Sequence, residues 1–428
     1  MLVVHSNPLA EPGSGDAGGM TVYVRQMAYS LAERGIEVDI FTRRNSAGSA
    51  TEVSLRPGVR VIQVDAGAPD LSKDQISAYL PEFSANLLEL VEDSGLVYDV
   101  VHSHYWLSGR VAAIVSSRWK VPFVHTFHTL GREKNRARRP GDLLEPEFRL
   151  DGEARVIADA CAIVASTAEE RKALIDLYSA HPERIHLIPP GVDHSTFRPE
   201  NREAAKAALG LAGNKVMLFV GRLQPLKAAD IAVDALGHLV RWGRLSVDEV
   251  RLLIIGGSSG PSGAGETERL AQRVEELGLR KAVQFIPAQA HDRLPGFYQT
   301  ADVCLVPSYT ESFGLVALEA QACGVPVVGS AVGGLKAIVR HGQTGFLISP
   351  GASESFAERA WMVLSDQRLS ESMGRLAVCS SGDFAWDRSA GELHDLYTAG
   401  TRSDDCSPSS MWSGKKPFGS RTIVLKRP

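Results

Sequence analysis

The sequence predicts an α/β protein of two Rossmann-like domains, each with a doubly wound parallel sheet, that face each other across a cleft. Its 428 residues are too many for one typical hydrophobic core. Short β-branched runs alternate with amphipathic stretches, which is typical of parallel sheets covered by helices. This alternation occurs twice, in two series separated by a segment rich in proline and polar residues.

The first series of predicted strands fills the N-terminal part of the chain. It opens with residues 2–4, a run about half as long as a buried parallel strand, so we expect residues to be missing upstream. Helices are expected at 20–34, 75–93 and 105–117. The other strands of this series are IEVDIFT, VRVIQV, YDVVHSH, PFVHTFH, CAIVAST and IHLIPPG.

The second series follows the joint PPGVDHSTFRPENREAA and consists of KVMLFVGR, VRLLIIGG, AVQFIP, DVCLVPS, PVVGSA and TGFLIS. We therefore expect an N-terminal domain at residues 1–196 and a C-terminal domain at 197–384. A helix at about 385–399 is expected to pack back on the N-terminal domain. The tail at 400–428 loses the periodic pattern and is expected to be disordered.

The composition indicates a globular protein, with 44% hydrophobic and 22% charged residues. A formal net charge of -4 argues against a general nucleic-acid surface, so no nucleic-acid partner is expected. No run approaches the roughly 18 apolar residues of a membrane span. Five scattered cysteines without a C-x-x-C pair indicate a reduced, cytoplasmic setting.

Two glutamates in PSYTESFGLVALEAQACGVPVV are the most informative candidates for a ligand site. Glu311 lies in a loop of Ser, Tyr and Thr, and Glu319 lies inside the helix predicted to follow. A ligand that passes the start of that helix would meet both carboxylates and a set of free backbone N–H groups. Helical glutamates are most often solvated surface charges, but the surrounding ESFG and EAQACGVPVV favour a sugar-nucleotide site.

Arg222 and Lys227 in VGRLQPLK follow a predicted strand of the second domain, on the side of the cleft. A nucleoside diphosphate gains negative charge as it leaves a sugar, and a guanidinium and an ammonium group would stabilise that charge. The alternative interpretation is that both residues are solvated surface cations.

In the first domain, the glycines of PGSGDAGGM follow the first predicted strand. They indicate either a loop whose backbone approaches a phosphate or a plain tight turn.

These motifs resemble those of the retaining glycosyltransferases of the GT-B fold, glycosyltransferase family four, from residue 1 to about 399. Glu311 and Glu319 match the E-x(7)-E signature, VGRLQPLK matches the GR-L-x-P-x-K loop, and PGSGDAGGM is similar to a GDSGGM or GDAGGM loop. The resemblance implies catalytic roles for His128, Arg222, Lys227 and Glu311. It implies donor contacts from Glu11, Pro12, Gly19, Arg222, Lys227, Gln289, Glu311, Phe313, Gly314, Leu315 and Glu319.

A closer resemblance is to the branch that transfers N-acetylglucosamine from UDP-GlcNAc to 1D-myo-inositol 3-phosphate, the first step of mycothiol biosynthesis. It is carried by HSHYWLSG and by the phosphate-binding set of Lys73, Tyr105, Thr129 and Arg149. With retention and no obvious carboxylate nucleophile, the leaving phosphate would take the acceptor's proton on the same face of the sugar. The full implied acceptor set is His5, Asp16, Ala17, Gly18, Gly19, Met20, Thr21, Lys73, Tyr105, Thr129 and Arg149.

Three positions depart from the family pattern. Thr21 stands in place of an asparagine, which removes an amide from the expected inositol contact. Glu11 replaces a glutamine and adds a charge near the expected diphosphate, and Ala228 replaces the glycine that usually follows the lysine of the basic loop. The basic run GREKNRARR is interpreted as a mostly solvated face that raises the local positive potential.

No cofactor is expected to be required for the chemistry, because no Asp-x-Asp pair offers a clamp for a catalytic divalent metal. The histidines of HSHYWLSG and HTFHTLGREKN lack a carboxylate or cysteine that would complete a metal site, so hydrogen-bonded histidines are the favoured interpretation. The resemblance is compatible with a homodimer. It is also compatible with a structural Mg²⁺ ion, which would be bound mainly by backbone carbonyl groups near Tyr298, Gln299, Ala301 and Val325.

Three other hypotheses stay open. Another GT-B transferase, acting on a different phosphorylated polyol or sugar, would keep Arg222, Lys227 and the two glutamates but lose the acceptor-phosphate set. A dinucleotide oxidoreductase would need G-x-G-x-x-G and an acidic residue at the end of the second strand, where IEVDIFTRR has arginines. The third is an inactive sugar-nucleotide-binding homologue, in which Thr21 or the short first strand has abolished turnover.

Overall fold

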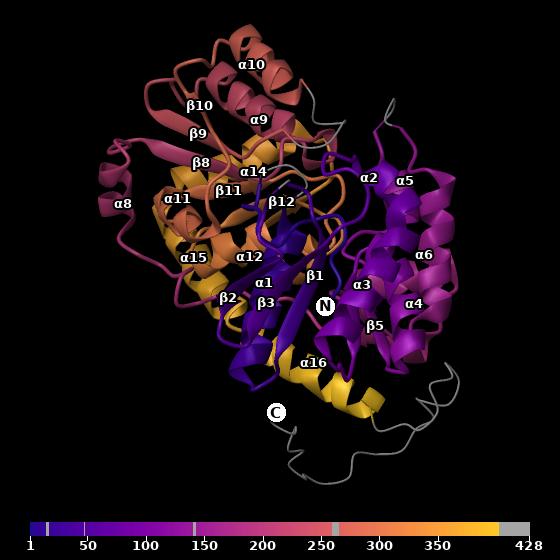
Figure 1. Cartoon of the computed structure of the whole chain (residues 1–428). Helices are drawn as coiled ribbons and strands as arrows, with labels where there is room; N and C mark the ends of the chain where they lie inside the picture. The colour runs from indigo at the N-terminus through magenta and orange to yellow at the C-terminus, as the bar shows by residue number, and fades with distance from the viewer. Residues whose placement is uncertain (14–16, 47, 140–142, 259–264, 402–428) are drawn as a thin grey trace.

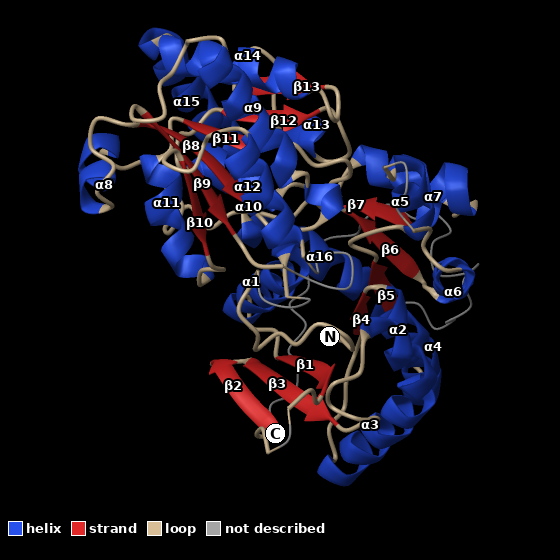
Figure 2. Cartoon of the chain, turned by 90° about the horizontal axis from the view of Figure 1, so that it is seen from above, coloured by secondary structure: helices blue, strands red, loops and turns tan. Residues whose placement is uncertain are grey.

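The computed structural model describes residues 1–13, 17–46, 48–139, 143–258 and 265–401, and these residues form two α/β lobes (Figure 1). Viewed from above, the strands of the two lobes form separate sheets with helices around each of them (Figure 2). The predicted fold class, two Rossmann-like domains with parallel sheets, is therefore confirmed. No helix in the described ranges is long and apolar enough to cross a membrane.

The N-terminal lobe has two groups of strands, ordered β1-β3-β2 and β4-β5-β6-β7. Its strands are β1 (Val38–Arg43), β2 (Glu52–Arg56), β3 (Val59–Val64), β4 (Val101–His104), β5 (Phe123–Thr126), β6 (Ala162–Ala165) and β7 (Ile185–Leu187). Its helices are α1 (Gly19–Glu33), α2 (Lys73–Ile76), α3 (Leu80–Ser94), α4 (Trp106–Trp119), α5 (Gly131–Ala137), α6 (Glu147–Asp159) and α7 (Ala168–Tyr178), with short 3₁₀ turns η1 (Ser77–Tyr79) and η2 (Pro182–Arg184).

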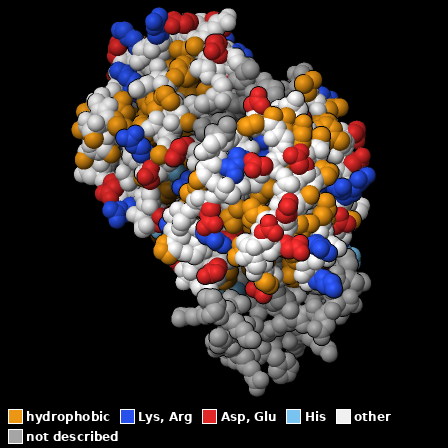
Figure 3. Space-filling model, viewed as in Figure 1, with side chains coloured by type: hydrophobic (Ala, Val, Ile, Leu, Met, Phe, Trp, Pro, Cys, Tyr) orange, Lys and Arg blue, Asp and Glu red, His pale blue; other side chains and the backbone are white. Residues whose placement is uncertain are grey.

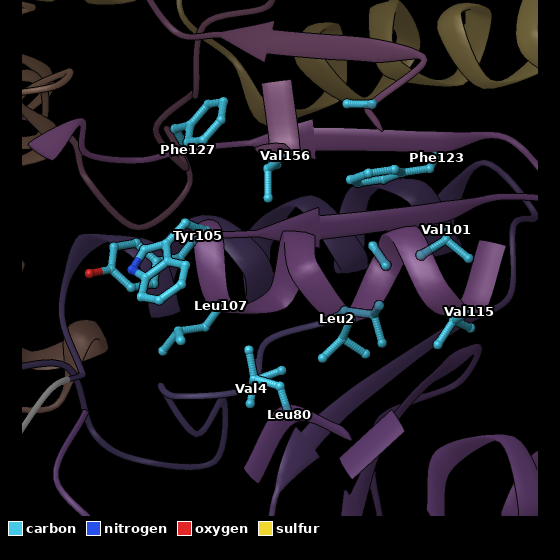
Figure 4. Packing of buried hydrophobic residues seen from close by; sticks show 14 of the residues in the cluster. Leu2, Val4, Leu80, Val101, Tyr105, Leu107, Val115, Phe123, Phe127 and Val156 are labelled. Carbon is cyan, nitrogen blue, oxygen red and sulfur yellow. The ribbon is translucent and has the colours of Figure 1, made fainter. Parts of the chain in front are cut away.

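Leu2 joins the two groups of strands, because it forms parallel bridges to Phe41 of β1 and to Ser103 of β4. The side chains of the opening run alternate as those of a strand do. Leu2 and Val4 belong to the core beneath α3 and α4 (Figure 4), whereas Val3 belongs to the core on the opposite face of the sheet. The short opening run thus occupies the central position of the sheet.

The alternation of strands and helices did not predict β2. This strand pairs antiparallel with β3, and its side chains alternate between exposed and half-buried. An edge strand with one solvated face has no continuous apolar run, so its pattern differs from that of the buried parallel strands. The N-terminal sheet is therefore mixed at one edge, whereas its other pairings are parallel.

The C-terminal lobe has one parallel sheet in the order β10-β9-β8-β11-β12-β13, the 3-2-1-4-5-6 order of dinucleotide-type folds. Its strands are β8 (Lys215–Val220), β9 (Val250–Ile255), β10 (Val283–Ile286), β11 (Val303–Val306), β12 (Val327–Ser330) and β13 (Gly345–Ile348). Its helices are α8 (Arg202–Ala208), α9 (Ala229–Arg241), α10 (Glu266–Glu276), α11 (Leu294–Thr300), α12 (Leu315–Ala322), α13 (Leu335–Ile338), α14 (Ser353–Ser365) and α15 (Gln367–Ser381), with 3₁₀ turns η3 (Pro225–Lys227) and η5 (His291–Arg293).

Two chain segments cross between the lobes side by side. Val192 forms a parallel bridge with Ala385, and its backbone N–H donates to the carbonyl of Phe384 at 3.2 Å. A Cβ on Gly191 would lie 2.2 Å from the backbone nitrogen of Trp386, so only glycine permits this close approach. The predicted domain boundary at 196 and 197 falls shortly after the first crossing.

The last described helix, α16 (Trp386–Thr401), follows the second crossing and lies beneath the N-terminal lobe (Figure 1). Its buried side chains, including Trp386 and Leu393, share one core with α1, β1 and β3. Most of the tail predicted at 400–428 lies outside the described residues. On the face of the molecule in Figure 3, positive and negative side chains are interspersed without a large area of one sign, in keeping with the small net charge.

Candidate active site

Several of the sequence-predicted site residues lie at the carboxyl ends of central strands in the two sheets. In the C-terminal lobe, the loop after β8 carries Arg222 and Lys227, and the loop after β11 carries Glu311. β8 and β11 are neighbours at the point where the strand order reverses, the position at which open α/β sheets bind ligands. In the N-terminal lobe, the corresponding loops follow residues 2–4 and β4, and they carry His5 and Tyr105.

Lys227 and Glu311 contact each other directly. The Nζ of Lys227 lies 2.6 Å from Oε2 of Glu311, and the hydroxyl of Ser308 donates to the same oxygen at 3.3 Å. Both side chains of the ion pair are partly exposed, at 27% and 16%. The pair therefore faces solvent at the entrance of α12, where a phosphate oxygen can compete with the carboxylate for the ammonium group.

The start of α12 is shaped by Gly314, which has a φ of +105°. A Cβ there would lie 2.8 Å from a methyl group of Leu335, so the turn accepts only glycine without movement. Phe313 is buried in the core beneath this turn, and Leu315 begins the helix. The first backbone N–H groups of α12 have no partner within the helix, which suits an anionic ligand.

Glu319 lies inside α12 and is only 4% exposed. Its two carboxylate oxygens contact the hydroxyl of Tyr298 and Nε2 of His291, each at 2.8 Å. Burial lowers the pKa of His291, but the Glu319 charge outweighs it and raises that pKa above its ordinary value. The two glutamates of the E-x(7)-E pair thus differ, because Glu311 faces the loop after β8 and Glu319 is held by buried protein groups.

The glycine loop of the N-terminal lobe packs directly against the C-terminal lobe. A Cβ on Gly18 would lie 3.2 Å from Nε of Arg222, and one on Gly19 would lie 3.6 Å from Leu315. Gly13 has a φ of +91°, and a Cβ there would lie 3.1 Å from Cβ of Ala288. The loop therefore lies at the junction of the lobes, next to the basic loop.

Lys73, Tyr105 and Arg149 form a cationic cluster in the N-terminal lobe. The Nζ of Lys73 is 5.7 Å from the centre of the Tyr105 ring, and the guanidinium carbon of Arg149 is 5.1 Å from it. Tyr105 has a φ of +70° and a ψ of 151°, a conformation that costs a non-glycine residue about 1–3 kcal/mol. Its hydroxyl is buried and has no hydrogen-bond partner among the described residues.

Local structure fixes the position of Lys73 in this cluster. Arg43 is buried, and its guanidinium donates to the carbonyls of Ala68 at 2.8 Å and Pro69 at 3.0 Å, which holds the loop that precedes α2. Ser72 then forms a capping box with Gln75 at the start of α2, in which the Gln75 side chain accepts from the Ser72 backbone N–H at 2.9 Å. Lys73 is the first residue of that helix.

Arg149 is 2% exposed and is held by three side chains. Its Nε donates to Glu153 at 2.8 Å, and its two terminal nitrogens donate to Glu145 at 2.7 Å and to the hydroxyl of Thr129 at 3.1 Å. The carbonyl of Thr129 also accepts from the guanidinium, at 3.4 Å. Because a guanidinium has five N–H donors, these four hydrogen bonds leave one donor for a ligand. The structure therefore brings together all four residues of the predicted acceptor-phosphate set.

His5 lies where the cations of both lobes meet. Its ring centre is 4.3 Å from that of Tyr105. Burial lowers the pKa of His5 well below its ordinary range, and the charges of Lys73, Arg149 and Arg222 lower it further. Arg222 belongs to the C-terminal lobe, so charges from both lobes lower the pKa of His5.

His128 sits at the lobe junction in a strained backbone conformation, with a φ of +61°. Its carbonyl accepts a hydrogen bond from the hydroxyl of Ser312 in the other lobe, and its Nε2 lies 3.0 Å from Nδ1 of His104. Burial lowers the pKa of His128 to about 3. The imidazole is therefore neutral at pH 7, where it can hydrogen-bond a sugar but does not act as a cationic acid.

Thr21 is buried at 1% exposure, and its hydroxyl lies 3.1 Å from that of Ser6. The threonine that replaces the family's asparagine thus forms a contact within the N-terminal lobe. Ala17 is buried and Met20 is half-buried nearby, whereas Asp16 lies outside the described residues. Of the remaining donor candidates, Glu11 is exposed, and Pro12 and Gln289 are half-buried.

Among the described residues, no group of three or more His, Cys, Asp or Glu side chains could hold a metal ion. Each histidine of HSHYWLSG and HTFHTLGREKN has at least one hydrogen-bonded ring nitrogen, and His102 bonds through both of its nitrogens, to Thr126 and Tyr397. The four carbonyl positions suggested for Mg²⁺ lie at the end of α11 and before β12. The carbonyl of Tyr298 accepts a hydrogen bond from the N–H of Ala301 at 3.0 Å.

Sequence reasoning missed several residues that support the site. Glu145 and Glu153 hold Arg149, and His291 holds Glu319. In the basic run GREKNRARR, Arg132, Arg136 and Arg138 are exposed, as expected of a mostly solvated face. Lys134 and Arg139 differ, because Lys134 binds Glu145 at 2.7 Å and Arg139 forms an ion pair with Asp230 of the other lobe. The spacing of Glu145 and Glu153, four residues on either side of Arg149, was the available signal.

Two lobes with parallel sheets, joined across a basic nucleotide-type site, define a GT-B type of transferase. Residues 201–377 match the family model described as glycosyl transferases group 1, and residues 18–191 match the glycosyl transferase 4-like domain. The D-inositol 3-phosphate glycosyltransferase of Nocardia farcinica is 46% identical over 403 residues, which cover 93% of this chain and 88% of that protein. The protein of the same name from Acidothermus cellulolyticus is 46% identical, with 93% and 89% covered. The chain belongs to this family of glycosyltransferases.

Solved structures agree with this assignment. Sucrose-phosphate synthase from Thermosynechococcus elongatus is 31% identical and superposes with a TM-score of 0.85, covering 93% of this chain and 97% of that one. The Anabaena protein HepE, in a complex with UDP-glucose, has a TM-score of 0.75 and is 20% identical, with 93% and 100% covered. The second likeness supports the fold alone.

Proposed function

We propose that the protein transfers N-acetylglucosamine from UDP-GlcNAc to 1D-myo-inositol 3-phosphate, with an α-linked product and UDP, as the first step of mycothiol biosynthesis. The main supporting observation is that Lys73 and Arg149 lie 5.7 and 5.1 Å from the Tyr105 ring, next to His5, while Arg222 of the other lobe packs against Gly18 of the glycine loop. One set of cations suits the acceptor phosphate, and the other suits the diphosphate of the donor. The name shared by relatives that are 46% identical supports the same acceptor.

In this proposal, the donor lies along the C-terminal lobe. Arg222 and Lys227 bind its diphosphate, Glu311 orients the hexose hydroxyls, and Glu319 accepts from the ribose. The backbone near Gln289 meets the uracil. The N–H groups at the entrance of α12 and the glycine loop complete the donor site through Phe313, Gly314, Leu315, Glu11, Pro12 and Gly19.

The acceptor lies against the N-terminal lobe, with its phosphate on Lys73, Tyr105, Thr129 and Arg149. His5 and the loop of residues 16–21 contact the inositol ring. The bond between the sugar's anomeric carbon and the UDP oxygen breaks, and the inositol hydroxyl forms its bond on the same face. The hydroxyl proton passes to the departing phosphate oxygen, so atoms and charge balance without a protein nucleophile. Neutral His128 hydrogen-bonds the hexose.

Several further assignments belong to the same proposal. The proposal includes a division into domains at 1–196 and 197–384. It also includes a homodimer and a cytoplasmic location. A structural Mg²⁺ on the carbonyls of Tyr298, Gln299, Ala301 and Val325 is a further part of it. No cofactor takes part in the transfer itself.

The test is an assay of UDP release from UDP-GlcNAc, with inositol 3-phosphate, with unphosphorylated myo-inositol, with a hexose phosphate, or without an acceptor. We expect rapid release only with inositol 3-phosphate. Release only with the hexose phosphate would identify a transferase with another acceptor. If no acceptor stimulated release but UDP still bound, the chain would be an inactive homologue.

A further inference from the structure

The charges around Arg149 are finely balanced. Three cations, Lys73, Lys134 and Arg149, share this region with two carboxylates, Glu145 and Glu153. Without Lys134, the two remaining cations would be cancelled by the two carboxylates. With Lys134, these five groups keep a net positive charge before any ligand enters, which favours the binding of a phosphate dianion.

Lys134 is placed to neutralise one of these carboxylates. It lies on α5, and its Nζ is 2.7 Å from Oε1 of Glu145, whose other oxygen accepts from Arg149 at 2.7 Å. The side chains of Lys134 and Glu145 are only 23% and 20% exposed. Glu145 therefore bridges two cations, and without the lysine its whole charge would act on the arginine.

A second observation indicates that this region accepts a ligand. The Tyr105 hydroxyl is buried without a hydrogen-bond partner among the described residues, although Lys73 and Arg149 both lie within 6 Å of the Tyr105 ring. An unsatisfied buried hydroxyl costs about 1–3 kcal/mol. A phosphate oxygen between these cations would accept from it and remove that cost.

We propose that Lys134 is a positioning residue for the acceptor phosphate, which acts by neutralising Glu145 so that Arg149 and Lys73 keep their charge for the ligand. The inference rests on the proposed function, since it concerns the phosphate of the same acceptor. It adds to that function a residue that touches neither substrate. Lys134 thereby contributes to the discrimination between phosphorylated and unphosphorylated acceptors.

The proposal predicts that acceptor binding depends on pH. Burial, together with the charge of Arg149, lowers the pKa of Lys134 to about 8, although Glu145 opposes the shift. As the pH rises through 8, Lys134 loses its proton in the free enzyme, and acceptor binding weakens. The phosphate stays a dianion throughout this range, since its second pKa is about 6. The charged groups around Lys134 are Glu145, Arg149 and Lys73 from the facing elements, Arg132, Glu133 and Arg136 on α5, and Glu169 of α7, which acts on Glu133.

The central experiment compares Lys134→Met with the double variant Lys134→Met/Glu145→Gln. We expect Lys134→Met to raise the KM for inositol 3-phosphate about tenfold at pH 7.5, as for the loss of one nearby charge, with the KM for UDP-GlcNAc unchanged. The double variant also removes the negative charge, so it should recover most of the acceptor affinity. A purely structural role predicts no recovery, so a double variant as weak as the single one would overturn the proposal.

The pH profile gives an independent readout. The acceptor KM of the unaltered protein should rise above pH 8, whereas that of Lys134→Arg should stay flat between pH 7 and 9.5, because arginine keeps its proton. Lys172→Met, at an exposed lysine that pairs with Asp176 on α7, is the control and should leave all constants unchanged. Equal acceptor KM values for Lys134→Met and the unaltered protein would overturn the inference. Absence of any acceptor-dependent turnover in the unaltered protein would instead overturn the proposed function.

Discussion

At the scale of single residues, the ion pair between Lys227 and Glu311 defines the resting state of the donor site. The two side chains are 2.6 Å apart, so the donor diphosphate must draw the ammonium group away from a carboxylate. Ala228, which follows Lys227, has a φ of +56° and is fully buried. Alanine is strained there by about 1–2 kcal/mol, which explains the glycine of the family pattern in physical terms.

Lys227→Ala is expected to lower kcat about 10²- to 10³-fold, with a much smaller change in the KM for UDP-GlcNAc. Negative charge develops on the departing diphosphate mainly as the glycosidic bond breaks, so the ammonium group acts chiefly on the transition state. Steady-state kinetics measure both constants. Lys281→Ala, at an exposed lysine paired with Asp248, is the control. An unchanged kcat in Lys227→Ala would refute the assigned role.

For Arg149, the informative substitution is lysine. Removal of the whole side chain would leave Glu145 and Glu153 without their shared cation and destabilise the fold by about 3–5 kcal/mol. Arg149→Lys keeps the charge but loses the guanidinium fork. We expect the KM for inositol 3-phosphate to rise roughly ten- to hundredfold, as for the loss of a charge-assisted hydrogen bond, and the KM for UDP-GlcNAc to stay constant. Equal increases in both constants would contradict an acceptor role.

At the scale of secondary-structure elements, the sequence predicted the buried parallel strands well, because most of them lie in short runs rich in β-branched residues between turn residues. It also placed the site loops correctly at strand ends. The antiparallel strand β2 escaped prediction because one of its faces is solvated. The pairing of Glu145 with Lys134 was not predicted, because it joins α5 to the loop before α6 through a tertiary contact that has no periodic signal in the sequence.

The start of α7 contains a titratable group that the sequence pattern also did not reveal. The side chain of Thr167 caps the helix by accepting from the N–H of Glu170, and the Glu170 carboxylate accepts from the N–H of Ser166 at 2.8 Å. Burial raises the pKa of Glu170 from 4.5 to about 7. The folded protein thus keeps a proton that the unfolded chain releases.

Glu170→Gln tests this effect through stability. The contribution of the protonated carboxyl to the free energy of unfolding is fully present below pH 4.5 and is lost as the pH rises through 7, by about 3 kcal/mol in total. Urea unfolding at several pH values should therefore show a smaller decrease in the variant between pH 4.5 and 7.5. Glu358→Gln, at an exposed site on α14, should keep the decrease of the unaltered protein. The prediction fails if Glu170→Gln keeps it as well.

At the scale of the whole molecule, contacts across the lobe junction hold the two halves of the site together. Arg139 donates to both carboxylate oxygens of Asp230, at 3.0 and 3.1 Å, and its guanidinium carbon lies 4.3 Å from the centre of the Tyr309 ring. Ser312 donates to the carbonyl of His128 from the opposite lobe. Because the basic loop and the acceptor cluster belong to different lobes, transfer requires this approach of the lobes.

Arg139→Ala is expected to shift the protein toward a more open arrangement. The ion pair is partly exposed and contributes about 1 kcal/mol, so its loss should reduce the ratio of closed to open molecules about fivefold and lower kcat/KM by up to a similar factor. Small-angle X-ray scattering should show a larger radius of gyration, which UDP and inositol 3-phosphate together reduce. Arg269→Ala is the matched control, because Arg269 pairs with the same Asp230 from within the C-terminal lobe. If both variants scattered like the unaltered protein, Arg139 would have no part in holding the lobes together.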